Sequence, residues 1–168
     1  AARGQAAPVP ARPAACLARA TYFGKMFARE PCQDAALARL LAAGPEPPGA
    51  IVIGLGLWDM LYTRDPAAFA RGLGAFLGMV RGAGYAGKVF WLAVTAVAEE
   101  RLPPFKRPHM STAAARAHNE AARPAAAEHG AAPVDLFALT LGRGNLSTDG
   151  VHYPGLVELS GAVIDALC

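Results

Sequence analysis

The chain has 168 residues, a formal net charge of +3 and a hydrophobic content of 54%. This length fits one domain with a single core, and no apolar run approaches the roughly 20 residues that a membrane-spanning helix needs. The basic residues near the N-terminus are scattered, which argues against the concentrated basic surface of a nucleic-acid-binding protein. The sequence also shows no basic-then-apolar start with a cleavage site, so no signal peptide is visible.

The N-terminal part is expected to contain little regular structure. Residues 1–18 are rich in Ala, Pro and Arg, and their prolines interrupt any helix or strand. We interpret them as a flexible lead-in to a domain over residues 19–168. Within that domain, residues 21–27 can form a short strand, and Asp34 is expected to cap a helix that runs to about Ala43.

Strands and helices then alternate. Residues 50–55 form an almost wholly apolar run, which is typical of a strand buried on both faces in a parallel sheet. Residues 88–94 have the same character and predict a second buried strand. Between them, Asp65 and Pro66 predict a helix start, followed by one apolar stripe. The stripe consists of Phe69, Leu73, Phe76 and Val80.

The C-terminal half continues the same alternation. A mixed-charge loop over residues 95–110 leads to an Ala-rich helix, which Ser111 is expected to cap and which should be irregular at Pro124. A third short strand is expected over residues 133–137. A final helix from Pro154 should bury Leu156, Leu159, Val163 and Leu167. The pattern therefore predicts an α/β fold, with a parallel sheet flanked by helices in three layers.

The main chemical signal is Asp149 and His152, within Ser147-Thr148-Asp149-Gly150-Val151-His152-Tyr153-Pro154. A carboxylate three residues from a histidine can hold the imidazole in one tautomer, as the acid and base of a hydrolytic triad do. The alternative is a polar turn before a helix, in which Asp149 binds only backbone amides.

Other reactive side chains have simpler interpretations. The cysteines match no metal-ligand spacing, and we interpret them as unpaired buried thiols, with a disulfide between the first two as the alternative. They are Cys16, Cys32 and Cys168. The remaining histidines (His109, His118 and His129) make no metal-binding pair, so no metal site is expected. Glu99 and Glu100 either face solvent or line a substrate groove.

The glycines after the first buried strand allow a competing interpretation. Gly54-Leu55-Gly56 follows that strand, as in the Gly-x-Gly of dinucleotide- or adenosylmethionine-binding domains. Asp59 stands where the third glycine would be, and the next helix is expected only at Asp65. Both departures argue against a nucleotide site.

The same stretch carries a resemblance to a known family. Gly56-Leu57-Trp58-Asp59, followed far downstream by Asp-Gly-Val-His before the last helix, resembles the block order of SGNH/GDSL-type hydrolases. It is similar in particular to the branch of PC-esterases and of sialic-acid and capsule-polysaccharide O-acetyltransferases. Residues 117–122 also resemble a helix segment of the acetyltransferases. The resemblance covers roughly residues 50–168.

This resemblance implies a fold and a chemistry. The fold would be the three-layer SGNH-like, flavodoxin-like sheet. The reaction would be acyl-ester chemistry on carbohydrate hydroxyls, with O-acetyl transfer as the first expectation and O-acetyl ester hydrolysis as the second. No metal or organic cofactor is implied, although a transferase needs an acetyl donor. The family context also implies the Golgi lumen or secretory pathway, and attachment to a membrane domain in a longer product.

Residue by residue, the resemblance makes His152 the general base and Asp149 its orienting acid. Gly56 and Trp58 fall in the block that shapes the oxyanion and acyl pocket. Core packing is the alternative role for Trp58. Asp59 is expected to cap the turn that follows it.

The nucleophile block of the family is missing. No Gly-Asp-Ser occurs, and the serines Ser111, Ser147 and Ser160 all lie downstream of Asp59 without the context of a nucleophile. Two hypotheses follow. Either the domain is N-terminally incomplete, so that an upstream strand supplies the serine and its absence leaves a sheet edge unpaired, or the chain is a catalytically inactive glycan-binding relative.

Overall fold

The computed structural model describes residues 28, 30–43, 47–154 and 156–167. Its sheet has three parallel strands in the order β1-β2-β3, so the second strand is central and paired on both sides. The strands are β1 (Ala50–Gly54), β2 (Lys88–Leu92) and β3 (Ala131–Val134). The expected lead-in over residues 1–18 and the expected strand over residues 21–27 lie outside the described residues.

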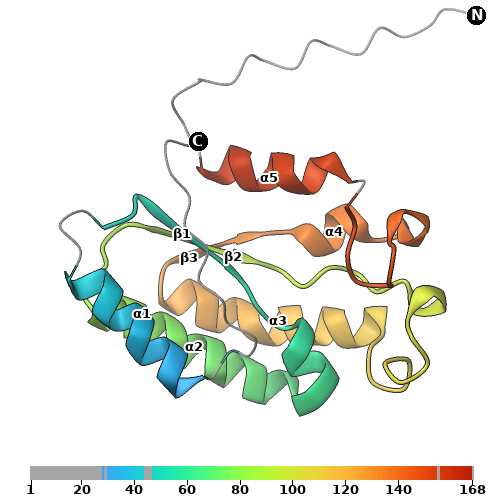
Figure 1. Cartoon of the computed structure of the whole chain (residues 1–168), viewed down its shortest axis with the longest axis horizontal. Helices are drawn as coiled ribbons and strands as arrows, with labels where there is room; N and C mark the ends of the chain where they lie inside the picture. Colours follow the sequence, from blue (N-terminus) through green and yellow to red (C-terminus); the bar gives the residue numbers. More distant parts are fainter. Residues whose placement is uncertain (1–27, 29, 44–46, 155, 168) are drawn as a thin grey trace, which may run out of the picture.

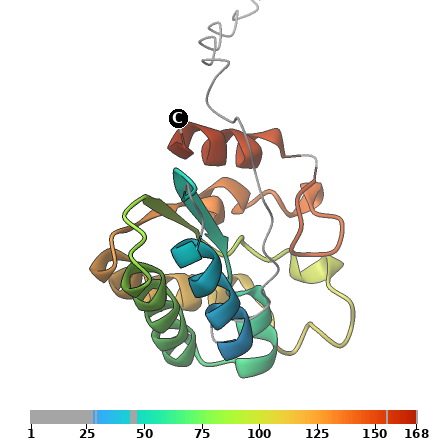
Figure 2. The same cartoon turned by 60° about the vertical axis from the view of Figure 1, so that its left-hand side comes forward.

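Helices cover both faces of this sheet (Figure 1). On one face lie α1 (Pro31–Ala43), α2 (Pro66–Gly82) and α3 (Thr112–Glu128), and on the other lie α4 (Leu136–Thr140) and α5 (Val157–Leu167). The turned view separates α5 from the three helices below the sheet (Figure 2). The predicted three-layer α/β architecture is confirmed. Among the described residues, no helix is long and apolar enough to cross a membrane.

The larger core lies between the sheet and α2. The predicted stripe of α2 is confirmed, since Phe69, Leu73 and Val80 are fully buried and Phe76 is nearly so. They pack in one cluster with Trp91 of β2, which is also fully buried. The predicted start of α2 is confirmed as well, because the Asp65 carboxylate accepts the Ala67 amide at 2.9 Å and Pro66 opens the helix.

Two element boundaries differ from the sequence prediction. Helix α1 begins at Pro31, so Asp34 lies inside its first turn, where the Asp34 amide donates to Glu30 O at 2.9 Å. Strand β3 ends at Val134, whereas the strand predicted over residues 133–137 would continue beyond it. It ends there because the Asp135 carboxylate accepts the Ala138 amide at 3.0 Å and caps α4.

Strand β1 is not buried on both faces, contrary to prediction. Its central residue Val52 is 38% exposed, whereas Val89 and Trp91 of β2 are buried. The reason is position: β1 pairs only with β2 among the described residues, and the helix on that face, α5, packs against β3 and α4. Within the part of the chain that the structure describes, no strand pairs with the other edge of β1, and the face that carries Val52 is thinly covered.

The remaining differences concern the helices after β2. Helix α3 is capped by Ser111, whose Oγ accepts the Ala114 amide at 3.0 Å, and it continues through Pro124 without the predicted irregularity. Helix α5 begins at Val157 instead of Pro154. Of its predicted stripe only Leu156, just before the helix, is fully buried. The other three side chains are half-buried.

Candidate functional site

Asp149 and His152 contact each other directly. The His152 ring Nδ1 lies 2.7 Å from Asp149 Oδ2, and the His152 backbone amide donates to Asp149 Oδ1 at 2.9 Å. A carboxylate only accepts, so in the neutral imidazole Nδ1 carries the proton and Nε2 the lone pair. The His152 side chain is 68% exposed, which leaves Nε2 open to a reactant. The Asp149 carboxylate therefore contacts the imidazole as well as a backbone amide.

These contacts keep Asp149 ionised. Partial burial acts to raise the pKa of the carboxyl, but hydrogen bonds from the His152 amide, the His152 ring and the Val151 amide outweigh it and lower the pKa to about 2. The carboxylate is therefore charged throughout the neutral range. An ionised partner holds the imidazole in place and stabilises the imidazolium that forms when Nε2 takes a proton.

Ser147 and Gly150 shape this turn from within. The buried Ser147 Oγ donates to His152 O and accepts the Gly150 amide, both at 2.9 Å. Gly150 has φ +90, and a Cβ there would lie 2.6 Å from Leu102 Cδ2 and 2.9 Å from Ala98 O. Glycine is required at this position by backbone conformation and by space.

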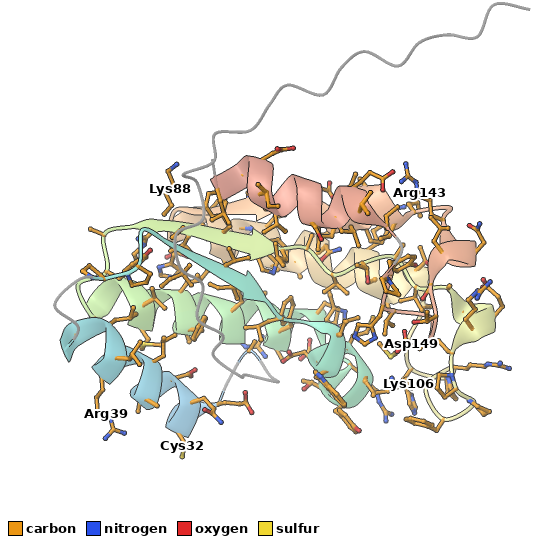
Figure 3. The ribbon with its side chains drawn as sticks, turned by 45° about the horizontal axis from the view of Figure 1, so that its top comes forward. Cys32, Arg39, Lys88, Lys106, Arg143 and Asp149 are labelled. Carbon is orange, nitrogen blue, oxygen red and sulfur yellow. The ribbon has the colours of Figure 1, made fainter. Side chains whose placement is uncertain are left out.

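The turn is fastened to the extended segment that follows β2. The Ala98 amide donates to Gly150 O at 2.9 Å, and the Tyr153 hydroxyl donates to Ala96 O at 2.7 Å. Thr95 Oγ1 adds a bond to Val151 O at 3.0 Å. In Figure 3, Asp149 lies at the opposite end of the domain from Lys88, the first residue of β2. The turn therefore lies beyond the carboxyl ends of the strands, where open α/β sheets bind ligands.

Side chains satisfy the backbone of this segment in place of a neighbouring strand. The buried Asn119 accepts the Val94 amide at 2.8 Å and donates to Val94 O at 2.9 Å. Thr140 Oγ1 accepts the Ala96 amide at 2.8 Å. This pairing explains why β2 ends at Leu92, short of the predicted Val94, while the chain beyond it stays extended.

Gly56 lies where the chain leaves β1. It has φ +118, and a Cβ there would lie 2.5 Å from Val94 Cγ2 and 3.0 Å from Phe69 Cζ. The positive φ and the close contacts therefore explain why glycine occupies this position, without a bound nucleotide phosphate. The chain then forms a π-helix, η1 (Asp59–Thr63), which the sequence analysis did not predict.

Trp58 is not a core residue, so that alternative is wrong. It is 40% exposed and stacks on Tyr62, with 5.6 Å between ring centroids and 4° between ring planes. Asp59 is buried, and its carboxylate accepts the Ala28 amide at 3.1 and 3.3 Å. This bond spans 31 residues, whereas the expected role was a local cap of the next turn.

None of the three serines hydrogen-bonds the His152 ring. Ser111 caps α3, Ser147 is buried within the turn, and Ser160 lies exposed on α5. The structure thus places a carboxylate against an exposed imidazole, and no serine in the described part of the chain is bonded to that ring.

A cavity of about 400 Å³ lies beside the turn, between the segment after β2 and the segment after α4. Its polar side chains are those of Glu100, Thr112, Thr140, Asn145 and Tyr153. Burial, followed by the charge of Glu100, raises the pKa of Tyr153, so its hydroxyl stays protonated. Thr112, Thr140 and Tyr153 already donate their hydroxyl hydrogens to backbone carbonyls, so the wall of the cavity presents mainly acceptor oxygens.

No metal site emerges from the described side chains. No group of three or more His, Cys, Asp or Glu in that part of the chain could hold an ion. Cys32 is a free, exposed thiol, which corrects the prediction that it is buried. Cys16 and Cys168 lie outside the described residues.

Sequence reasoning missed several residues that build the site. Tyr62 and Tyr153 belong to no recognisable motif. Tyr62 stacks on Trp58, and Tyr153 donates to Ala96 O in a distant segment of the chain. Asn119 left a detectable signal. It shares the buried face of α3 with Ala115, Ala122 and Ala126, and a polar residue on an apolar helix face needs a buried partner.

Comparisons with known proteins identify the architecture. No protein-family model matches the sequence, and no curated protein matches it. Among solved structures, a lipase/acylhydrolase from Enterococcus faecalis aligns with a TM-score of 0.55 and 23% identity, over 71% of this chain and 61% of that protein. The chain thus spans about three fifths of that protein's length.

Two further solved structures agree with this result. A member of the lipolytic G-D-S-L family from Veillonella parvula aligns with a TM-score of 0.57 and 14% identity, over 79% of this chain and 71% of that protein. An acetyl xylan esterase aligns with a TM-score of 0.56 and 16% identity, over 72% and 68% of the two chains. The chain has the three-layer α/β fold of the SGNH/GDSL-type hydrolases.

Proposed function

We propose that this chain carries the general base and the orienting acid of a serine-dependent acyl-ester enzyme. The observation that carries the proposal is the 2.7 Å contact between His152 Nδ1 and Asp149 Oδ2, beyond the carboxyl ends of a parallel sheet of SGNH type. The tautomer set by Asp149 leaves His152 Nε2 as an exposed base, which is what a hydroxyl nucleophile requires.

The reaction would proceed in two steps. A serine Oγ attacks the acyl carbon of an ester while His152 Nε2 takes the hydroxyl proton. The imidazolium then returns this proton to the departing alcohol, leaving an acyl-serine. In the second step a sugar hydroxyl or water attacks the acyl-serine, and His152 again removes and returns one proton. Attack by a sugar gives O-acyl transfer, and attack by water gives hydrolysis.

The edge of β1 that pairs with none of the described strands offers a place for the missing nucleophile. A further parallel strand pairing there would end at the same edge of the sheet as the Asp149–His152 turn. We propose that a serine after such a strand completes the triad. Gly56 would form the oxyanion pocket with the backbone at Trp58, since the glycine lets the chain turn tightly where β1 ends.

The proposed substrate is an acetylated carbohydrate, with O-acetyl transfer as the first activity and ester hydrolysis as the second. The resemblance of Gly56-Leu57-Trp58-Asp59 to the block of the acetyltransferase branch supports the former. The likeness in fold to an acetyl xylan esterase supports an acetylated sugar in either case.

The test uses a product that contains the serine-bearing strand, assayed for release or transfer of acetate from an acetylated sugar. His152→Ala should lower kcat by at least about a thousandfold because it removes the base, and Asp149→Asn by a similar factor because it removes the carboxylate that sets the imidazole tautomer. His109→Ala, in the mixed-charge loop, is the control and should retain activity. Near-full activity of His152→Ala would overturn the assignment.

A second candidate is a catalytically inactive glycan-binding relative. The observation that favours it is that none of the described serines hydrogen-bonds the His152 ring. A fluorophosphonate probe separates the two functions, because it labels an activated serine and leaves a pseudoenzyme unmodified. Glycan binding without any acyl-serine adduct would decide for the binding protein.

A further inference from the structure

Glu100 is a charged residue to which the proposed reaction gives no role. It lines the cavity of about 400 Å³ beside the Asp149–His152 turn. Its neighbour Glu99 is engaged, because Glu99 Oε1 accepts the Thr112 amide at 3.0 Å. The Glu100 carboxylate, in contrast, accepts no hydrogen bond and forms no ion pair with the described residues. This carboxylate is therefore free to receive a ligand.

The backbone around Glu100 is anchored to the turn that carries His152. Glu100 lies in the short helix η2 (Glu99–Arg101). On one side of it, the Ala98 amide donates to Gly150 O at 2.9 Å, and on the other, Arg101 Nη1 donates to Ser147 O at 2.9 Å. The carboxylate is thus carried by a segment that is fixed at both ends.

Gly144 makes room for this carboxylate. A Cβ at Gly144 would lie 3.1 Å from Glu100 Oε1 and 3.0 Å from Ala98 Cβ. Gly144 is not among the glycines with positive φ, so space accounts for the glycine here and backbone conformation does not. The Glu100 carboxylate therefore lies close to the bare backbone at the start of η3 (Gly144–Leu146).

Hydrogen-bond donors are scarce in the wall of the cavity. Three backbone amides of the segment after β2 line it, and all donate elsewhere, to Thr140 Oγ1, Thr112 Oγ1 and Gly150 O. They are the amides of Ala96, Val97 and Ala98. The hydroxyl hydrogens are spent on backbone carbonyls, and Asn145 is the side chain of the wall that keeps N–H groups. The wall therefore presents mostly oxygen lone pairs and one negative charge, which favours a ligand that donates.

Glu100 and Tyr153 bring two electron-rich oxygens into the same cavity. Burial is the larger cause of the raised pKa of Tyr153 and the charge of Glu100 is the second, so the carboxylate and the phenol interact. No hydrogen bond joins them, because the phenol donates its hydrogen to Ala96 O at 2.7 Å. A positive charge that donates to both oxygens would offset this repulsion between acceptors.

The cavity suits an organic cation better than a metal ion. A divalent metal needs several carboxylate or imidazole ligands, and no group of three such side chains occurs in the described part of the chain. A volume of about 400 Å³ falls within the range of small-molecule sites. A protonated amine offers three N–H donors, one positive charge and no acceptor, which complements this wall.

We propose that this cavity binds the ammonium group of a small organic molecule through Glu100 and the oxygen of Tyr153. The inference names a ligand group that the proposed function does not include. It rests on the proposed function only in that the amine-bearing molecule would be the alcohol part of the ester. Binding of the amine requires neither His152 nor a nucleophile, so it can be measured on this chain alone.

The test compares D-glucosamine with D-glucose, which differ only in an ammonium or a hydroxyl group on the same ring. Amide chemical shifts of Ala98 and Gly144 follow the titration by NMR. Glucosamine should bind at least about fivefold more tightly than glucose, and this difference should shrink at high salt. Equal affinities for the two sugars would overturn the ammonium site.

Matched variants locate the charge that is responsible. Glu100→Gln keeps the shape of the side chain and should weaken glucosamine binding by about fivefold. Glu99→Gln removes the same charge one residue away and should bind as the wild type does. Gly144→Ala should also weaken binding, because its Cβ displaces the Glu100 carboxylate. Unchanged binding in Glu100→Gln, or equal weakening in Glu99→Gln, would contradict the proposal.

The outcomes also separate this inference from the proposed function. Loss of glucosamine binding in Glu100→Gln together with an active His152→Ala would retain the ammonium site and reject the catalytic assignment. Intact binding in Glu100→Gln with an inactive His152→Ala would do the reverse. Displacement of glucosamine by magnesium chloride, but not by sodium chloride of equal ionic strength, would assign the cavity to a metal ion and overturn the ammonium site.

Discussion

The Asp149 carboxylate binds His152 twice, through the ring Nδ1 at 2.7 Å and through the backbone amide at 2.9 Å. One carboxylate therefore both closes the turn and orients the imidazole. This double contact couples the local stability of the turn to the geometry of the proposed base.

The first prediction concerns acid stability. The pKa of Asp149 is lowered from its ordinary value of 3.8 to about 2, so the carboxylate stabilises the folded state above about pH 4, and this stabilisation is lost as the pH falls toward 2. Asp149→Asn should lower Tm at pH 6, and the difference from the wild type should shrink between pH 4 and pH 2. Thermal melts across this range provide the measurement; a Tm difference independent of pH would contradict the prediction.

The second prediction concerns Gly150. Gly150→Ala should reduce the free energy of unfolding by about 2–4 kcal/mol, because it combines a positive φ with a clash against Leu102 and Ala98. Gly142 is the matched control. Its φ is +75 but nothing lies within 4 Å of a Cβ there, so Gly142→Ala should cost only about 1 kcal/mol. Urea unfolding of both variants measures the difference, and equal losses would argue against the close packing at Gly150.

The third prediction concerns Asn119. Asn119→Ala leaves the buried amide and carbonyl of Val94 without partners and should reduce the free energy of unfolding by about 2–4 kcal/mol. The control is Asn145→Ala at an exposed position, expected within about 0.5 kcal/mol of the wild type. Chemical denaturation measures both variants. If Asn119→Ala were as stable as the control, the side chain would not be holding the segment after β2.

The fourth prediction concerns Ser147. Its hydroxyl bridges His152 O and the Gly150 amide, so Ser147→Ala should reduce the free energy of unfolding by about 1–3 kcal/mol. Fluorophosphonate labelling of a product with the serine-bearing strand should persist in this variant. Loss of labelling with unchanged stability would instead identify Ser147 as the nucleophile.

Local patterns accounted for much of the fold. Asp65-Pro66 and Ser111 start their helices as predicted, because a cap depends only on the next few residues. The strand–helix–strand order around α2 likewise predicted the parallel pairing of β1 and β2. Boundaries were less accurate where a second cap was overlooked, as at Asp135, which ends β3 and starts α4.

The contents of the site were only partly predictable. The spacing of Asp149 and His152 was sufficient to propose their contact, since both lie in one turn. One partner of Asp59, in contrast, is an amide 31 residues away, and the partner of the Asn119 amide group is a backbone 25 residues away. No local pattern specifies which distant backbone such a side chain will meet.

The sequence by itself determined the alternation of strands and helices and the pairing of an acid with a base, because both follow from residues close together in the chain. Only the tertiary structure decided that Val52 is exposed, that Trp58 stacks on Tyr62 at the surface, and that Ser147 is buried. These outcomes depend on how many strands share the sheet and which segments meet beyond their ends. They are set by packing between segments far apart in the chain.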